Sequence, residues 1–347
     1  MKKTIKMNFV DYWDGFVFED NFIIKLLSER YNIELSDNPD YLLCSVFGTD
    51  HLNYDCIKIL YTGENQFPDF NLYDYAIGFE YMELGDRYLR FPCGLQSNSI
   101  VDSMLAKCQF NNNDLKQKTG FCSFVYSNNN ASPERKIFFD LLSSYKQVSS
   151  GGRYMNNIGG AVRDKLAFQK QFKFVIAFEN CSYPGYTTEK IVQAFAADAI
   201  PIYWGDPLVI KDFNPASFIN CNDYNSFDDV VKRIIEIDND DEIYLSIMRE
   251  SPINPDSKIR NIHKDLADFL FHIFDQPLEQ AKRYNRVYWG KRYINQQRER
   301  QRAYNHSLRG IAYRIYKRSY SLLMSNKRKS IFLWKIDRFI KKTFSKK

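Results

Sequence analysis

Strand-like and helix-like runs alternate along the first hundred residues of the chain. The strand-like runs are rich in aromatic and β-branched residues, whereas FEDNFIIKLLSER has its apolar residues at helical spacing. Strands and helices in this order predict an α/β domain with a largely parallel sheet. The predicted strands lie in IKMNFVDYW, YLLCSVFG, IKILYTGEN, YDYAIGFEY and RYLRFP.

The pattern restarts after the polar segment QFNNNDLKQKTG, residues 109–120, which we interpret as a linker. A second α/β unit of Rossmann size is predicted beyond it, and two such domains in series are the architecture of many sugar-nucleotide transferases. Its predicted strands are FCSFVYS, FKFVIAF, AIPIYWG and SFINC, and its predicted helices are ERKIFFDLLSSY, AVRDKLAFQKQ and TEKIVQAFAAD.

We therefore expect four segments. They are Rossmann-like domains over residues 1–112 and 118–265, closing helices over 266–290, and a tail over 291–347.

The tail differs from the rest of the chain in charge. Residues 281–347 carry 21 Lys and Arg against two acidic residues, whereas the remaining 280 residues carry 27 basic and 40 acidic groups. Apolar residues at near-helical spacing among the basic ones predict one or two amphipathic helices in the tail. We favour binding to an anionic membrane surface over packing on the acidic body. Nucleic-acid binding is disfavoured, because the body is negative and no such motif occurs.

Several features of the sequence indicate where the protein is located and whether it binds a metal. No run reaches the roughly 18 apolar residues that span a bilayer, and the first residues lack the apolar run of a signal peptide. The seven cysteines contain no C-x-x-C pair, and the four histidines have no metal-ligand spacing. The triplet Asp238-Asn239-Asp240 precedes a predicted helix, so capping explains it better than metal binding. A cytoplasmic protein without a zinc site is expected.

A polar loop, FENCSYPGYTTEK, follows the predicted strand FKFVIAF. Ligands of parallel α/β sheets bind at the carboxyl ends of the strands, where this loop begins. Thr187 or Thr188 is predicted to cap the next helix, whose free N–H groups favour an anion. Lys190 in the first turn opposes the helix dipole, and a bound phosphate would remove that conflict.

The same loop offers three more polar side chains. Glu189 is an acceptor suited to sugar or ribose hydroxyls, Tyr186 can stack or hydrogen-bond, and Asn180 can bind a polar ligand edge. A capped surface helix with solvated charges explains the loop equally well, so the residues alone leave both interpretations open.

Two other predicted strand ends carry candidate residues. Ser127 follows the strand FCSFVYS, and Arg135 lies in the first turn of the next helix, where a guanidinium can bind phosphate oxygens. Glu64 follows the strand IKIL and can act as a general base. A salt-bridged Arg135 and a turn-forming Glu64 are the better interpretations of each residue alone. Two adjacent βα units with a cation in the first turn favour a diphosphate.

Two stretches carry a family resemblance. FENCSYPGYTTEKIVQAFAADAIPIYWG resembles the signature of the α-1,3/1,4-fucosyltransferases, glycosyltransferase family 10, with F-E-N, Y-x-T-E-K and I-P-I-Y-W-G in order. YTGENQFPDFNLYDYAIGFEYMELGDRYLRFP resembles the first-domain motif, especially of bacterial members. The similarity covers residues 1 to about 275 in matching order.

The resemblance implies a GT-B fold, in which two Rossmann-like domains face each other across a cleft. Residues 1–112 would bind the acceptor and residues 118–265 GDP-β-L-fucose. The implied reaction moves L-fucose to a hydroxyl of N-acetylglucosamine in a galactose–N-acetylglucosamine type glycan, with α-1,3 favoured over α-1,4. The alternatives are a GT-B transferase for another sugar nucleotide and an inactive glycan- or nucleotide-binding relative.

By motif matching, the resemblance also assigns residue roles. Because the donor is β-linked and the product α-linked, one carboxylate suffices as base for an inverting reaction. Cations and a helix N-terminus stabilise the leaving GDP. The implied roles are general base for Glu64, pyrophosphate binding for Arg135 and Lys190, donor contact for Asn180, Tyr186 and Glu189, and a phosphate contact for Ser127.

The resemblance further implies that no metal is required, although Mn²⁺ or Mg²⁺ stimulates some relatives. The expected partners are GDP-fucose, the acceptor oligosaccharide and an anionic membrane surface, but no nucleic acid. A homodimer is left open, because YINQQRERQRAYNHSL lacks the clean seven-residue repeats of the bacterial relatives. The expected location is cytoplasmic, peripheral on the inner face of the cytoplasmic membrane.

Overall fold

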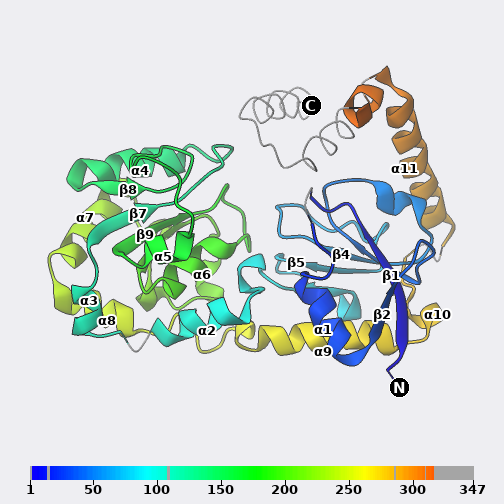
Figure 1. Ribbon diagram of the computed structural model, residues 1–347, viewed down its shortest axis with the longest axis horizontal. Coiled ribbons are helices and arrows are strands. Elements are labelled where there is room, and N and C mark those ends of the chain that lie inside the picture. The colour runs from blue at the N-terminus through cyan, green and yellow to red at the C-terminus, as the bar shows by residue number, and fades with distance from the viewer. Residues whose placement is uncertain (1, 14–15, 108–109, 285–286, 309, 316–347) are drawn as a thin grey trace. The chain divides into compact units, whose positions relative to one another are not determined.

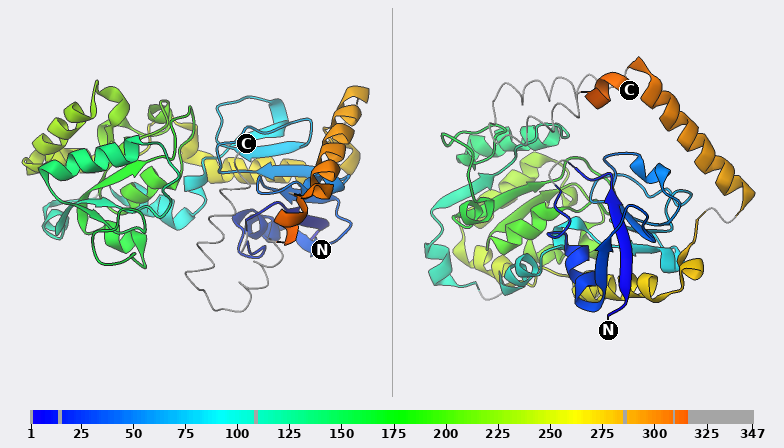
Figure 2. Two further views of the ribbon diagram at one scale, coloured as in Figure 1. Left: turned by 90° about the horizontal axis from the view of Figure 1, so that it is seen from above. Right: turned by 45° about the vertical axis from the view of Figure 1, so that its right-hand side comes forward.

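The structure is a computed structural model that describes residues 2–13, 16–107, 110–284, 287–308 and 310–315. The chain forms two compact units and contains two β-sheets (Figures 1 and 2). The first unit comprises Met1–Tyr61, Pro68–Ala76 and Gln276–Lys347, and the second Thr62–Phe67 and Ile77–Asp275. The expected segment boundaries at 112, 118, 265 and 290 stay predictions.

The first sheet has six strands in the order β2-β1-β3-β4-β5-β6. Its recorded pairings among β1 to β4 are parallel. Every residue of β3, β4 and β5 is buried, which is the pattern of parallel strands covered on both faces. The strands are β1 (Thr4–Val10), β2 (Asn32–Leu35), β3 (Tyr41–Cys44), β4 (Ile57–Tyr61), β5 (Tyr75–Gly78) and β6 (Tyr88–Arg90).

The second sheet has five strands in the order β11-β10-β9-β7-β8, and all recorded pairings are parallel. The chain passes from β7 to its neighbour β8 and then crosses to β9 on the other side of β7. The strands are β7 (Gly120–Phe124), β8 (Val148–Ser150), β9 (Phe172–Phe178), β10 (Ile200–Trp204) and β11 (Ile219–Asn220).

Helices cover both faces of the second sheet (Figure 1). Phe174, Ile176 and Phe178 of β9 share a core with α4, α7 and α8. The alternate residues Val175 and Ala177 are also buried, and α5 and α6 pack against β9 on that other face. The helices are α4 (Glu134–Tyr145), α5 (Lys165–Gln169), α6 (Glu189–Ala196), α7 (Phe227–Asp238) and α8 (Asp241–Arg249).

The remaining described α-helices are α1 (Phe22–Arg30), α2 (Asn98–Ala106), α3 (Asn112–Lys116), α9 (Ile262–Asp275), α10 (Leu278–Ala281) and α11 (Tyr288–His306). Short 3₁₀ helices include η1 (Asp50–Asn53) and η3 (Cys93–Leu95).

The prediction of two parallel-sheet α/β domains is confirmed. The interpretation of residues 109–120 as a linker is wrong, because α3 forms within them. Asn111 accepts a hydrogen bond from the Asn113 N–H, and the Asp114 carboxylate accepts one from the Asn111 N–H. This capping box stabilises a short helix in a polar sequence.

The described part of the tail packs on the first unit through α11 (Figure 2). Ile294 is buried, the Arg298 Nε donates to the Leu52 carbonyl at 2.7 Å, and the Tyr293 hydroxyl donates to Asp69 at 2.7 Å. This part follows the second interpretation of the tail, packing on the body. The amphipathic helix predicted around Phe332 and Ile340 lies outside the described residues. Within the described ranges, no helix is both long and apolar enough to cross a bilayer.

Candidate active site

The crossing of the chain from β8 to β9 makes a topological switch point in the second sheet. Open α/β sheets bind ligands at the carboxyl ends of the strands beside such a point. The loops that leave β7 and β9 there are residues 125–133 and 179–188. All predicted donor-contacting residues lie in these two loops or in the first turn of the helix that follows each.

Glu179, the first residue after β9, is a fully buried carboxylate. Its Oε1 accepts the Thr188 N–H at 2.8 Å, and its Oε2 accepts the Thr188 hydroxyl at 2.6 Å. Gly205 has φ +149°, and a Cβ there would lie 2.6 Å from the Glu179 side chain. The glycine therefore leaves the space that the carboxylate occupies. Sequence analysis missed Glu179, although it follows directly on a buried strand.

Lys190 forms an ion pair with this buried carboxylate. Its Nζ lies 2.8 Å from Glu179 Oε2, 2.6 Å from Thr188 Oγ1 and 3.6 Å from Glu189 Oε1. Burial lowers the pKa of Lys190, but the Glu179 and Glu189 carboxylates outweigh it and raise that pKa well above its usual value. Glu179 thus already offsets the conflict between Lys190 and the helix dipole, and the pyrophosphate role of Lys190 stays a prediction.

The start of α6 is also organised by acids rather than by threonine caps. Thr188 occupies the N-cap, but its side chain makes no capping hydrogen bond and donates to Glu179 instead. The Thr187 hydroxyl donates to Asp206 Oδ2 at 2.9 Å, and this buried carboxylate also accepts the Gly185 N–H at 2.7 Å. The prediction is therefore confirmed for the N-cap position of Thr188, but not for a capping hydrogen bond from either threonine side chain. Asp206 was missed as well, and the acid directly after the W-G pair was its signal.

Arg135 is 2% exposed and lies at the bottom of the loop after β7. Its Nη2 donates to the Phe178 carbonyl at 3.1 Å and to Asn180 Oδ1 at 2.8 Å, and its Nη1 donates to the Asn128 carbonyl at 3.4 Å. The guanidinium also stacks 4.0 Å from the centre of the Tyr126 ring. These contacts join the exits of β7 and β9.

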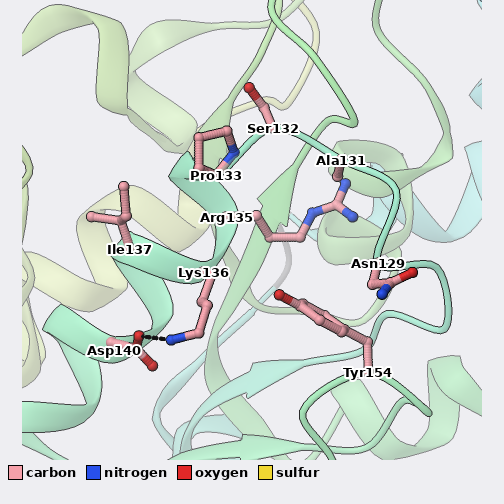
Figure 3. Close-up of a pocket in the computed structure, with 9 residues that line it drawn as sticks. All are labelled: Asn129, Ala131, Ser132, Pro133, Arg135, Lys136, Ile137, Asp140 and Tyr154. Atoms are coloured by element: carbon pink, nitrogen blue, oxygen red, sulfur yellow. Dashed lines mark hydrogen bonds and ion pairs between the residues drawn. The ribbon is translucent and has the colours of Figure 1, made fainter.

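A pocket of about 200 Å³ lies beside Arg135, with Tyr154 on its other side (Figure 3). Lys136 and Asp140 pair with each other at its edge. The other lining residues are Asn129, Ala131, Ser132, Pro133 and Ile137.

The other residues that were predicted to contact the sugar-nucleotide donor differ in exposure. Tyr186 is 4% exposed, its ring meets that of Phe79 edge-on at 5.2 Å, and burial raises the pKa of its hydroxyl. Ser127 is exposed at the strand exit. The Glu189 side chain is 43% exposed. Burial raises the pKa of its carboxyl, but Lys190 and Lys165 outweigh this effect and lower it.

Glu64 belongs to the second unit together with these loops. It is exposed, and its hydrogen bonds to other described residues are made by its backbone. Its N–H donates to Thr62 Oγ1 at 3.0 Å, and its carbonyl accepts the Gln66 N–H at 2.7 Å. The Asn65 side chain donates to the Cys181 sulfur at 3.2 Å, which joins this segment to the loop after β9.

Close contacts join Cys93 and Gly94 to the segment of Glu64 and to the start of α6. A Cβ on Gly63 would lie 2.8 Å from Cys93 Cβ, and a Cβ on Gly94 would lie 2.9 Å from Glu189 Cα. Burial, together with the charges of Glu189, Glu179 and Glu64, raises the pKa of the Cys93 thiol to about 12, while Lys190 opposes them. The structure therefore brings Glu64 into the same electrostatic neighbourhood as Glu189 and the Glu179–Lys190 pair.

The residues of the D-x-D triplet have structural partners. Asp240 caps α8 by accepting the Glu242 and Ile243 N–H groups, and Asp238 pairs with Lys146 and Lys173. The prediction of capping is confirmed. Across the described ranges, no group of three or more His, Cys, Asp or Glu could hold a metal ion.

Family models match both halves of the body. Residues 7–95 match the N-terminal domain of alpha-(1,3)-fucosyltransferase FucT, and residues 115–249 match the C-terminal domain of glycosyltransferase family 10 (fucosyltransferase).

Individual relatives agree with these models. Alpha-(1,3)-fucosyltransferase FucT of Helicobacter pylori is 38% identical over 274 residues, which are 68% of this chain and 57% of that protein. The chain thus spans less than two thirds of that relative's length.

Solved structures match over most of their own length. A crystal structure of an alpha1,3-fucosyltransferase has a TM-score of 0.70 at 32% identity and covers 79% of this chain and 91% of its own. A structure of an alpha1,3-fucosyltransferase with GDP-fucose has a TM-score of 0.64 at 31% identity and covers 77% and 91%. The two parallel-sheet units, the matched domains and these relatives together show that the chain has the GT-B fold and belongs to glycosyltransferase family 10, the fucosyltransferases.

Proposed function

We propose that the chain is an inverting α-1,3-fucosyltransferase. It transfers L-fucose from GDP-β-L-fucose to a hydroxyl of N-acetylglucosamine in a galactose–N-acetylglucosamine type glycan. The observation that carries the proposal is the position of Glu64, an exposed carboxylate whose segment contacts Cys93 and the loop after β9, beside the start of α6. The preference for α-1,3 over α-1,4 rests on the named activities of the similar proteins.

In this proposal the loops after β7 and β9 hold the donor. Arg135 and Lys190 contribute positive charge near its diphosphate, and Ser127 adds a hydroxyl. Asn180 accepts a hydrogen bond from Arg135 and so orients the guanidinium. The partly exposed Glu189 accepts hydrogen bonds from hydroxyls of the donor, and Tyr186 lines the loop beside it.

The chemical step needs one base. Glu64 takes the proton of the acceptor hydroxyl while that oxygen forms a bond to C1 of fucose. The bond between C1 and the phosphate oxygen breaks on the opposite face, and GDP leaves with the electron pair. The β-linked donor thus gives an α-linked product. Positive charge placed at the diphosphate stabilises the leaving group as it gains charge.

We propose that the reaction requires no metal, because lysine and arginine side chains supply the positive charge at the diphosphate. Mn²⁺ or Mg²⁺ would act as stimulators only. The test is activity after exhaustive chelation: retained turnover supports the proposal, and loss that is restored by one of these ions contradicts it.

We further propose that the enzyme is peripheral on the inner face of the cytoplasmic membrane, held by the basic residues of the tail. Removing residues 316–347 should abolish binding to anionic vesicles and leave transfer to a soluble acceptor unchanged. A full-length protein that ignores anionic vesicles contradicts this location. Whether the protein dimerises is measured on the same sample by light scattering.

The activity itself is tested with GDP-fucose and a galactose-β-1,4-N-acetylglucosamine acceptor, followed by linkage analysis of the product by NMR. An α-1,3-fucosylated trisaccharide is expected. Transfer from another sugar nucleotide but not from GDP-fucose would favour a different GT-B transferase. GDP binding without any transfer would favour an inactive relative.

A further inference from the structure

We infer that Lys165 is a further donor-binding residue, whose ammonium group contacts the diphosphate of the nucleotide directly. This inference rests on the proposed function, since it assigns an additional contact to the same donor site. It starts from how the two cations predicted for the diphosphate, Arg135 and Lys190, are already engaged with protein groups.

Lys190 gives most of its hydrogen-bonding capacity to the protein. The Nζ has three N–H donors, and Glu179 and Thr188 lie 2.8 Å and 2.6 Å from it. Its positive charge is compensated by a carboxylate that is fully buried and cannot move into solvent. A phosphate near Lys190 therefore meets an ion pair rather than an isolated cation.

The guanidinium of Arg135 is engaged mainly by neutral protein groups. Among the described residues, no carboxylate pairs with its charge. Its Nη1 and Nη2 donate to Phe178, Asn180 and Asn128, and its buried Nε has no hydrogen-bond partner there. Tyr126 covers one face of the guanidinium. With 2% of its surface exposed, Arg135 acts on a ligand mainly through its charge. A direct contact to both phosphates needs another donor.

Lys165 meets this requirement by its place in the fold. It is the first residue of α5, the helix that leads from β8 into β9, so it lies toward the carboxyl edge of the sheet. The short helix packs against α6, the helix that carries Glu189 and Lys190 (Figure 1). Lys165 is partly exposed, and no hydrogen bond or ion pair joins its ammonium group to another described residue.

The charges around Lys165 agree with this position. Burial lowers the pKa of Lys165, and Glu189 opposes this effect, with Lys190 and Arg135 contributing as like charges. Lys165 in turn lowers the pKa of the Glu189 carboxyl. Arg135 and Lys190 each donate to described acceptors, whereas the ammonium group of Lys165 has none among the described residues.

The loop before α5 holds this arrangement in place. The Asn156 side chain donates to the carbonyls of Ser150, Gly152 and Gly160, and the Val162 N–H donates to the Gly151 carbonyl at 2.9 Å. These bonds fix the path of the chain from β8 to Lys165.

The loop also contacts the exit of β7. The Tyr154 N–H donates to the Tyr126 carbonyl at 2.9 Å, and a Cβ on Gly152 would lie 1.9 Å from that carbonyl oxygen. The same Tyr126 carries its ring beneath Arg135, so the loop is anchored at the switch point.

The test compares GDP and guanosine binding in purified full-length variants. Lys165→Ala should weaken GDP binding about tenfold, the size expected for one charge-assisted hydrogen bond, and should leave guanosine binding unchanged. Lys165→Arg should restore most of the GDP affinity. The matched control is Lys170→Ala, because Lys170 is an exposed lysine at the other end of the same helix. It should bind GDP like the wild type.

Each other outcome overturns the inference. Unchanged GDP affinity in Lys165→Ala shows that the lysine makes no diphosphate contact. An equal loss of GDP and guanosine affinity shows that the substitution disturbs the loop instead. If the wild-type protein binds neither GDP nor GDP-fucose, the proposed function fails with the inference. If the wild type binds GDP and Lys165→Ala binds it equally well, the inference fails but the proposed function does not.

Discussion

The segment after β4 and the loop after β9 both place a glutamate just beyond a buried strand, but the two glutamates differ in exposure and in hydrogen bonding. Glu64 is exposed, and the structure records hydrogen bonds for its backbone only. Glu179 is fully buried, and its two oxygens accept hydrogen bonds from Thr188 and Lys190.

Under the proposed function, the difference separates a reacting carboxylate from a structural one. A base must reach the proton that it takes and must have a free oxygen to receive it. Glu64 is exposed, and the described residues give its carboxylate no hydrogen-bond partner, as the proposed role requires. A buried carboxylate whose oxygens are already hydrogen-bonded instead fixes its neighbours, and Glu179 thereby orients the first turn of α6. The predictions below test this division.

The largest effect is expected for Glu64→Gln. The amide keeps the shape of the side chain but cannot take the proton, so transfer should fall about a thousandfold, within the range for loss of a general base. Turnover of GDP-fucose with saturating acceptor is the measurement. The control Glu83→Gln changes another highly exposed carboxylate of the same unit and should leave turnover unchanged. Wild-type turnover in Glu64→Gln would remove the base assignment.

A large loss of stability is expected for Glu179→Gln. The substitution leaves the buried Lys190 charge without its carboxylate, which should lower the free energy of unfolding by about 3–5 kcal/mol. Urea denaturation measures it. Glu236→Gln, which breaks an exposed pair with Arg233, should change stability by less than about 1 kcal/mol. Similar stabilities for the two variants would contradict a structural role of Glu179.

A smaller effect is expected for Gly205→Ala. Its φ of +149° disfavours a side chain, and the new Cβ would meet Glu179 at 2.6 Å. A loss of about 2 kcal/mol is expected from the strain, measured by the same denaturation. Gly160→Ala, at a glycine with nothing within 4 Å of the added Cβ, is the control. Equal effects at both glycines would show that the space beside Glu179 is not critical.

A pH-dependent change in stability is expected from Lys118, for which the described residues hold no paired carboxylate. Lys118 donates to the carbonyls of Lys170 and Ala197, and burial lowers its pKa to about 8 despite the opposing charge of Asp198. Between pH 8 and the unfolded-state value of roughly 10.4, the unfolded chain binds more protons, so stability should rise with pH. Lys118→Met should lack this rise. If the stability of Lys118→Met rises with pH as steeply as that of the wild type, another group causes the rise.

Much of the fold was predictable because buried parallel strands read as continuous apolar runs. FKFVIAF and ERKIFFDLLSSY match the bounds of β9 and α4. The strand β8, with only Val148–Ser150, has too few residues to show a period, and no strand was predicted there.

The site was predictable in its residues more than in its contacts. The strand exits indicated where Asn180 and Lys190 lie, since parallel strands end at one edge. Their partners depend on how the loop folds back over eleven residues from Glu179 to Lys190, which no local pattern reports. For the same reason the loop that positions Lys165 gave no signal in the sequence.

The most direct test of the division between the two glutamates is the affinity of Glu64→Gln for GDP-fucose, measured by calorimetry on the sample used for turnover. If the exposed carboxylate acts only on the acceptor proton, the dissociation constant should stay within about twofold of the wild-type value while transfer is lost. A loss of donor affinity in parallel with the loss of transfer would contradict the account, because Glu64 would then belong to the donor site.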